Sequence, residues 1–199
     1  PMIEEKALSL SRRKENLTGQ DHKKNRELNL SDTFTSTSKF VIPRHYKLTL
    51  KPDLDTFTFG GEVEIHVEML KPVDSITLNA SELDLTKVSV ESENITLNEP
   101  TIRENKEDET ITFGFGHEIT SREATITIEF TGVLNDRLLG FYRSRYIGAD
   151  GGERYLAATQ FESTDARRAF PCWDEPERKA TFDVTLIIPQ DLVAISNMP

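Results

Sequence analysis

The chain of 199 residues has a single cysteine, Cys172, and no excess of basic residues. One cysteine cannot form an intrachain disulfide, so a disulfide-stapled scaffold is excluded. The 24 Lys and Arg residues are outnumbered by 34 Asp and Glu, and the formal net charge is −10. This balance argues against a nucleic-acid binder, which needs clustered positive charge to neutralise phosphates. No apolar run reaches the roughly 18 residues of a membrane span, so we expect no span in this segment.

Histidine is also scarce, with four residues, and none is placed for a complete metal site. The zinc motif H-E-x-x-H needs two histidines one helical turn apart, with a glutamate between them that activates water. His117 and Glu118 begin this pattern, but Ser121 stands where the second histidine belongs. Cys172 has no histidine after it in the chain to act as a base, so we interpret it as a small buried thiol. We therefore expect neither metal ligands nor catalytic residues in this segment.

Residues 1–39 differ in composition from the rest of the chain. Apolar residues are sparse there and follow no period, and residues 31–38 are mostly Ser and Thr. Such a segment buries too little apolar surface to offset its loss of conformational entropy. We therefore predict a disordered polar tail over residues 1–39, followed by one domain over residues 40–199.

From residue 40 the apolar residues alternate with polar ones, which is the period of a strand with one buried face. In residues 62–69, for example, four apolar side chains alternate with three glutamates and a histidine. Several short strands of this kind, with no alternating helices, predict antiparallel sheets packed as a sandwich or saddle. The fold class is therefore mostly β. The apolar positions are Tyr46/Leu48/Leu50, Val63/Ile65/Val67/Met69, Ile76/Leu78, Val88/Val90, Ile111/Phe113/Phe115, Ala124/Ile126/Ile128/Phe130 and Ala180/Phe182/Val184/Leu186/Ile188.

Glycine and proline predict the ends of these strands. We expect turns at residues 59–61, 71–72, 99–100, 132 and 148–152. Residues 164–170 alone have a helical pattern, with Ser163 or Thr164 as the capping residue and Asp165 in the first turn.

The chemically densest segment covers residues 159–176 and contains Gln160 and Glu162. If the segment is extended, the side chains of these two residues lie on one face, because they are two residues apart. Together they can then enclose a small cation. A carboxylate there can bind a protonated α-amine, with the amide beside it orienting a side chain or a carbonyl. The alternative is that Glu162 only pairs with Arg167 or Arg168, because charge clusters are usually structural networks.

The same segment resembles one shared by zinc-dependent aminopeptidases of the aminopeptidase N and puromycin-sensitive aminopeptidase family. The stretch Phe161-Glu162-Ser163-Thr164-Asp165-Ala166-Arg167-Arg168-Ala169-Phe170-Pro171-Cys172-Trp173 is most similar to the cytosolic puromycin-sensitive branch. Residues 43–46, 57–63, 139–144 and 193–199 agree with the family as well. The resemblance covers residues 40–199, is most specific in the last 60, and leaves out the tail.

The resemblance implies the N-terminal, saddle-shaped β domain of an enzyme that removes single amino acids from peptide N-termini. Gln160 would line the pocket for the first side chain of the substrate, and Glu162 would bind its free α-amine. An acid at the closed end of a cleft selects an ammonium group, since it is otherwise left unpaired. One zinc ion would be bound by H-E-x-x-H on a downstream catalytic domain against which this domain packs. We expect the segment alone to be inactive and incomplete at its C-terminal end, and the enzyme to be cytoplasmic rather than secreted or a membrane-anchored ectoenzyme.

Two other hypotheses are compatible with the sequence. The first is a stand-alone, non-catalytic β-sandwich that acts as an interaction module. The second is a secreted sandwich that carries glycans at its four Asn-x-Ser/Thr tripeptides, which begin at Asn16, Asn29, Asn79 and Asn94. Such tripeptides arise often by chance in a chain rich in Ser and Thr, so they are weak support.

Overall fold

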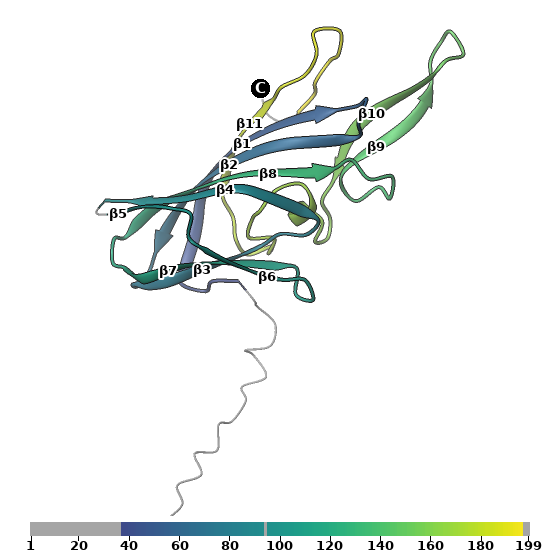
Figure 1. Cartoon of the computed structure of the whole chain (residues 1–199). Helices are drawn as coiled ribbons and strands as arrows, with labels where there is room; N and C mark the ends of the chain where they lie inside the picture. Colours follow the sequence, from purple (N-terminus) through teal and green to yellow (C-terminus); the bar gives the residue numbers. More distant parts are fainter. Residues whose placement is uncertain (1–36, 94, 197–199) are drawn as a thin grey trace, which may run out of the picture. The chain divides into compact units, whose positions relative to one another are not determined.

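The computed structural model describes residues 37–93 and 95–196, and strands dominate it. The prediction of a mostly β fold is confirmed (Figure 1). The elements are β1 (Val41–Asp53), β2 (Thr58–Met69), β3 (Val73–Asn79), β4 (Leu83–Ser92), β5 (Ile95–Asn98), β6 (Thr101–Asn105), β7 (Thr110–Ile119), β8 (Glu123–Val133), β9 (Gly140–Ile147), β10 (Glu153–Gln160), the 3₁₀ turn η2 (Ala166–Arg168) and β11 (Thr181–Leu186).

Two sheets form the two layers of the domain. The larger sheet has six strands in the order β11-β1-β2-β8-β4-β5, and the smaller has three in the order β3-β7-β6. A third, two-stranded sheet is the hairpin of β9 and β10, whose turn lies well away from the two layers (Figure 1). The strand pairs are antiparallel except for β11, which runs parallel to β1. Parallel pairing needs a long crossover, and here the chain between β1 and β11 contains the other nine strands.

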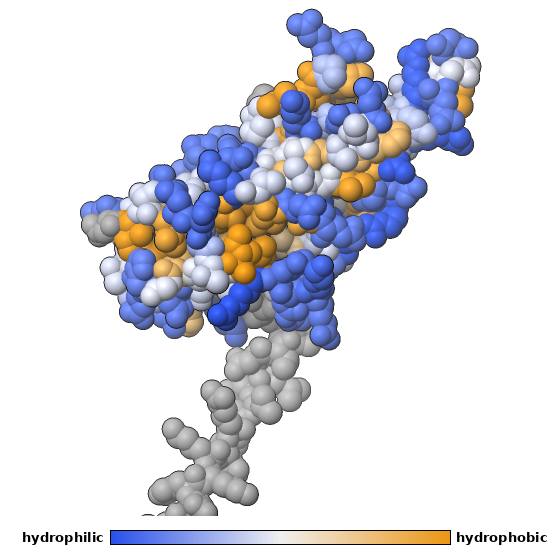
Figure 2. All heavy atoms as spheres, viewed as in Figure 1, coloured by the Kyte–Doolittle hydropathy of each residue, from blue (hydrophilic) through white to orange (hydrophobic). Residues whose placement is uncertain are grey.

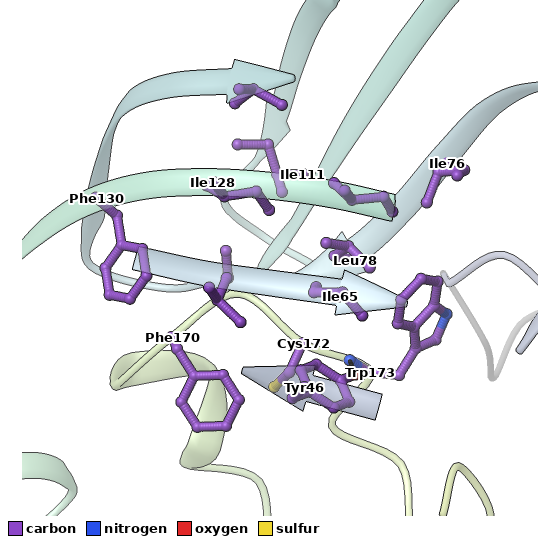
Figure 3. Packing of buried hydrophobic residues seen from close by; sticks show 14 of the residues in the cluster. Tyr46, Ile65, Ile76, Leu78, Ile111, Ile128, Phe130, Phe170, Cys172 and Trp173 are labelled. Carbon is purple, nitrogen blue, oxygen red and sulfur yellow. Dashed lines mark hydrogen bonds between the residues drawn. The ribbon is translucent and has the colours of Figure 1, made fainter. Parts of the chain in front are cut away.

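The core lies between the two layers and is built from the predicted apolar faces. On β8, for example, Ile126 faces Ile65 of β2 on one side and Val90 of β4 on the other. Figure 3 shows side chains of the larger sheet, such as Ile65 and Ile128, pointing toward Ile76, Leu78 and Ile111 of the smaller one. Removing this apolar area from water is the main favourable term in folding.

Phenylalanine and glycine form cross-strand pairs where turns were predicted. Phe59, Gly60 and Gly61 lie within β2, and Gly132 lies within β8, so both turn predictions are wrong. Gly61 is opposite Phe130, and Gly132 is opposite Phe59. A Cβ atom on either glycine would stand 2.4 Å from a ring carbon of its partner. Glycine is therefore needed here because an aromatic ring covers the backbone, not because the chain turns.

The structure also differs from the sequence predictions at residues 164–170 and at four strands. The expected helix over residues 164–170 is only the 3₁₀ turn η2, and its N-cap is Asp165 rather than Ser163 or Thr164. Asp165 makes no capping hydrogen bond because its carboxylate accepts one from Arg168 Nε at 3.0 Å instead. The hairpin strands β9 and β10 and the short strands β5 and β6 were not predicted, because alternation in them is weak or the runs are short.

The predicted tail lies mostly outside the described residues, which begin at Thr37. Thr37 is buried and donates its hydroxyl to Glu175, and the Thr77 amide donates to Ser38 Oγ at 2.9 Å. Ordered contacts therefore extend at least to Thr37, inside the segment that the composition assigns to the tail.

We predict that Gly61→Ala destabilises the domain by about 1–3 kcal/mol, because the new methyl group overlaps the buried Phe130 ring. Gly60→Ala is the matched control, since a Cβ atom there meets nothing within 4 Å. It should leave the free energy of unfolding within about 1 kcal/mol of the parent. Urea unfolding followed by circular dichroism measures both, and equal losses in the two variants would contradict the packing argument.

Candidate functional site

The segment from β10 to residue 176 leaves the hairpin, makes one tight turn and returns to the core. The Phe161 and Phe170 rings meet edge to face with centroids 6.0 Å apart. Beyond them, Cys172 and Asn79 exchange two backbone hydrogen bonds of 2.8 and 3.0 Å, which attach the returning chain to the end of β3. Figure 3 shows Phe170, Cys172 and Trp173 beside Tyr46 of β1. Apolar packing thus fixes both ends of the turn that contains Glu162.

Arg167 and Arg168 bring together acids from three distant parts of the chain. Arg167 donates from Nε to Asp174 at 3.0 Å and lies 3.3 Å from Glu109. Arg168 contacts Asp165 at 3.0 Å, and both Glu82 and Glu109 at 2.6 Å. Both arginine side chains are largely shielded, with exposed fractions of 12% and 17%. Partial burial makes such pairs stronger than surface ion pairs.

The pKa of Glu82 shows the effect of this network. The side-chain hydrogen bond from Arg137 and the charge of Arg168 hold the pKa of Glu82 below its usual value, against partial desolvation. The carboxylate therefore stays ionised to a lower pH than a free glutamate.

Glu162 takes no part in the network. Its side chain is exposed, and within the described residues its carboxylate has no hydrogen-bond or ion-pair partner. The alternative that Glu162 pairs with Arg167 or Arg168 is therefore wrong, because both arginines are engaged by other acids. An exposed carboxylate beside a neutralised cluster is available to a cation from outside.

Gln160 lies next to Glu162, as its spacing predicts. It is the last residue of β10, and its Nε2 donates a long hydrogen bond of 3.4 Å to the Glu162 carbonyl oxygen. The Glu162–Ser163 peptide bond is cis. The amide of Gln160 and the carboxylate of Glu162 therefore lie on one short stretch of backbone that solvent reaches.

The opposite face of this stretch borders an apolar groove of about 710 Å³. Thr159, Phe161 and Ser163 line it, whereas Gln160 and Glu162 do not. Residues 159–163 thus alternate between positions that line the groove and positions that do not, and of these lining residues only Phe161 is partly buried. The remaining walls come from β1, β11 and the returning segment, and include Tyr46, Phe170, Trp173 and Phe182.

Cys172 is confirmed as a buried thiol. It is 4% exposed, and burial raises the pKa of its thiol well above the usual range, with the negative charge of Asp174 adding to the shift. Both effects keep it protonated and unreactive at neutral pH.

Asn79 is buried too, and its side-chain oxygen accepts a hydrogen bond from the Asp174 amide at 3.1 Å. A glycan at Asn79 is therefore incompatible with the folded domain. Asn16, Asn29 and Asn94 lie outside the described residues.

His117 and Glu118 lie on the exposed part of β7, and residues 37–93 and 95–196 contain no group of three His, Cys, Asp or Glu side chains arranged to hold a metal ion. In the same residues, no helix is long and apolar enough to cross a membrane.

The sequence did not predict the partners of the arginines. In the structure Glu82 and Glu109 lie just before β4 and β7. In the sequence they stand 86 and 59 residues from Arg168, and neither periodicity nor a motif links them to it. The sequence signal for an ion-pair network was the excess of acids near Arg167 and Arg168. It suggested Glu162 as their partner, and Glu162 pairs with neither arginine.

The fold is a two-layer β domain, and its loop after β10 presents the amide of Gln160 and the carboxylate of Glu162 to solvent. Residues 42–199 match the model of the peptidase M1 N-terminal domain, and the chain belongs to that family. Among the relatives is Aminopeptidase M1 of Arabidopsis thaliana, 44% identical over 165 residues. Aminopeptidase M1-D of Oryza sativa subsp. japonica is 43% identical over 161 residues, and "Aminopeptidase 2, mitochondrial" of Saccharomyces cerevisiae is 42% identical over 163.

The matches cover most of this chain but little of the relatives. They include 81% of the chain for the two plant proteins and 79% for the yeast protein. The same matches span 19%, 18% and 17% of the Arabidopsis, rice and yeast proteins, respectively. The chain therefore spans about a fifth of the length of the curated relatives that it matches.

We predict that Cys172 reacts with iodoacetamide at least about tenfold more slowly in the native chain than in the urea-unfolded chain, because the thiol is buried and protonated. Mass spectrometry of the alkylated protein over time measures both rates. Equal rates would show that the returning segment opens readily and that the site is not held by the contacts described above.

Proposed function

We propose that this chain supplies the amine-binding end of the substrate cleft in a zinc-dependent metalloaminopeptidase, an enzyme that removes single amino acids from peptide N-termini. The observation that carries the proposal is the exposed, unpaired carboxylate of Glu162 in a chain where nearby acids are neutralised by arginine. Family membership and the names of the relatives support it.

Glu162 would bind the protonated α-amine of a peptide by charge-assisted hydrogen bonds. Gln160 offers both a donor and an acceptor beside it, which suits contact with the first side chain or the first carbonyl of the substrate. A peptide whose amine is blocked leaves the carboxylate unpaired when the cleft closes, and that penalty makes the enzyme an exopeptidase.

The zinc ion belongs in this proposal to another part of the longer protein. The motif H-E-x-x-H is not complete in this sequence, and we assign to this chain the binding and orientation of the substrate. Peptides with a free N-terminus are the proposed substrates, and no nucleic acid is expected as a partner.

Exposed apolar side chains support packing of this domain against a downstream catalytic domain. Phe182, Ile187, Val193 and Ile195 all reach the surface, the last two with about nine-tenths of their area exposed, at 88% and 89%. Figure 2 shows an apolar patch near the C-terminal end of β11. Contiguous apolar surface of this kind usually marks an interface.

We propose the cytoplasm as the compartment, from the wording of residues 161–173 and the single cysteine. The name of the yeast relative refers to mitochondria. Cell fractionation with a tagged full-length protein separates the two compartments.

The test of the proposed function is Glu162→Gln in the longer protein that contains this chain. The rate constant kcat/KM for a peptide with a free amine should fall about 30- to 1000-fold, which corresponds to the roughly 2–4 kcal/mol of a lost charge-assisted contact. Glu118→Gln, an exposed acid on β7, is the control and should change kcat/KM less than twofold.

The matched substrate is the same peptide with an acetylated N-terminus. The parent enzyme should cleave it poorly, and Glu162→Gln should narrow the difference between the two peptides. If the parent cleaves acetylated and free peptides equally well, Glu162 is not an amine anchor and the proposal fails.

A further inference from the structure

We propose that Arg168 is a positioning residue that sets the spacing between Gln160 and Glu162, an inference that rests on the proposed function. Arg168 does not touch either residue. It acts through the two backbone segments that hold them, the base of the β9–β10 hairpin and the turn that precedes η2.

All three guanidinium nitrogens of Arg168 are engaged. Nε donates to Asp165 in the same turn at 3.0 Å, Nη1 donates to Glu82 before β4 at 2.6 Å, and Nη2 donates to Glu109 before β7 at 2.6 Å. Nη1 also lies 3.2 Å from Ser81 Oγ. Arg168 thus connects the turn to both layers of the domain. A lysine keeps the charge but, as a single point donor, cannot reproduce this fork.

The aliphatic part of Arg168 meets the hairpin. Gly140 is the first residue of β9 and is opposite Gln160 in the β9–β10 pair. It has a φ angle of +66°, and a Cβ atom there would stand 2.6 Å from Arg168 Cβ and 3.1 Å from the Asp165 carbonyl oxygen. The base of the hairpin therefore rests directly on the turn, with no space for a side chain.

These contacts restrain Gln160 and Glu162 from two sides. Gln160 is fixed by its strand partner Gly140, which lies against Arg168. Glu162 lies in the turn closed by the hydrogen bond from the Asp165 amide to the Phe161 carbonyl oxygen, 2.9 Å, and Asp165 is held by Arg168. Moving Arg168 therefore changes the position of the amide relative to the carboxylate, while the neighbouring Arg167 pairs toward Asp174 and the core.

The experiment measures KM and kcat separately in the longer protein, with free and N-acetylated peptides. Arg168→Lys and Gly140→Ala should each raise KM for the free peptide about tenfold and reduce the preference over the acetylated peptide, with kcat within about threefold. Arg154→Lys is the control, because that arginine pairs with Asp150 near the hairpin turn, 2.8 Å apart, and should change neither quantity.

Glu82→Gln keeps the test decisive if a larger change prevents folding, since Glu82 is half exposed and Arg168 keeps its pairs with Asp165 and Glu109. The variant also loses the pair between Glu82 and Arg137. It should raise KM in the same direction by about threefold. Variants that lower only the amount of active enzyme, with KM and peptide preference unchanged, would show a purely structural role and overturn the inference.

Measuring Glu162→Gln in the same assays distinguishes failure of the positioning role of Arg168 from failure of the proposed function. If Glu162→Gln weakens use of the free peptide and the Arg168, Gly140 and Glu82 variants do not, only the positioning role fails. If Glu162→Gln itself has no effect, the proposed function fails and the positioning role fails with it.

Discussion

Two adjacent arginines determine how the acids around the candidate site are arranged. The chain has 34 acidic and 24 basic residues, and Arg168 alone engages three carboxylates. Arg167 and Arg168 engage Glu82, Glu109, Asp165 and Asp174, and Glu162 is left exposed and unpaired. Because the two arginine side chains are largely shielded, breaking one of these pairs leaves a poorly solvated charge. The network therefore restrains the turn, and it leaves the Glu162 carboxylate without a partner among the described residues.

The hydrophobic core holds the chain segment that follows this network. The apolar faces of the two sheets meet between the layers, and the chain returns into the core through Phe170, Cys172 and Trp173 (Figure 3). Tyr46 connects the two regions, since its ring stacks on Phe182 of β11 with centroids 4.7 Å apart and its hydroxyl accepts a hydrogen bond from the Trp173 amide at 3.2 Å. Burial raises the pKa of Tyr46, so this hydroxyl stays protonated.

The sequence predictions that the structure confirms are those based on the alternation of apolar and polar residues along a strand. In residues 62–69 of β2 the four apolar side chains are buried and the polar ones between them are exposed or partly buried, because one face of that strand lies on the core. The turn predictions at Gly61 and Gly132 failed because local propensity does not reveal an aromatic ring on the neighbouring strand. The helix predicted over residues 164–170 shrank to η2 because Asp165 pairs with Arg168 instead of capping. The hairpin of β9 and β10 lacks a strong alternating face, so its existence was not predicted.

The sequence by itself determined the fold class, the two candidate residues and their proximity, since alternation and a spacing of two are local properties of the chain. The resemblance to the aminopeptidase family gave Gln160 and Glu162 their expected roles. Only the tertiary structure decided that Glu162 pairs with neither Arg167 nor Arg168, because the partners of Arg168 at Glu82 and Glu109 come from distant strand ends. It also decided that Gly140 lies against Arg168. Such contacts depend on how the hairpin of β9 and β10 packs against the two sheets, and no local pattern in the sequence specifies this packing.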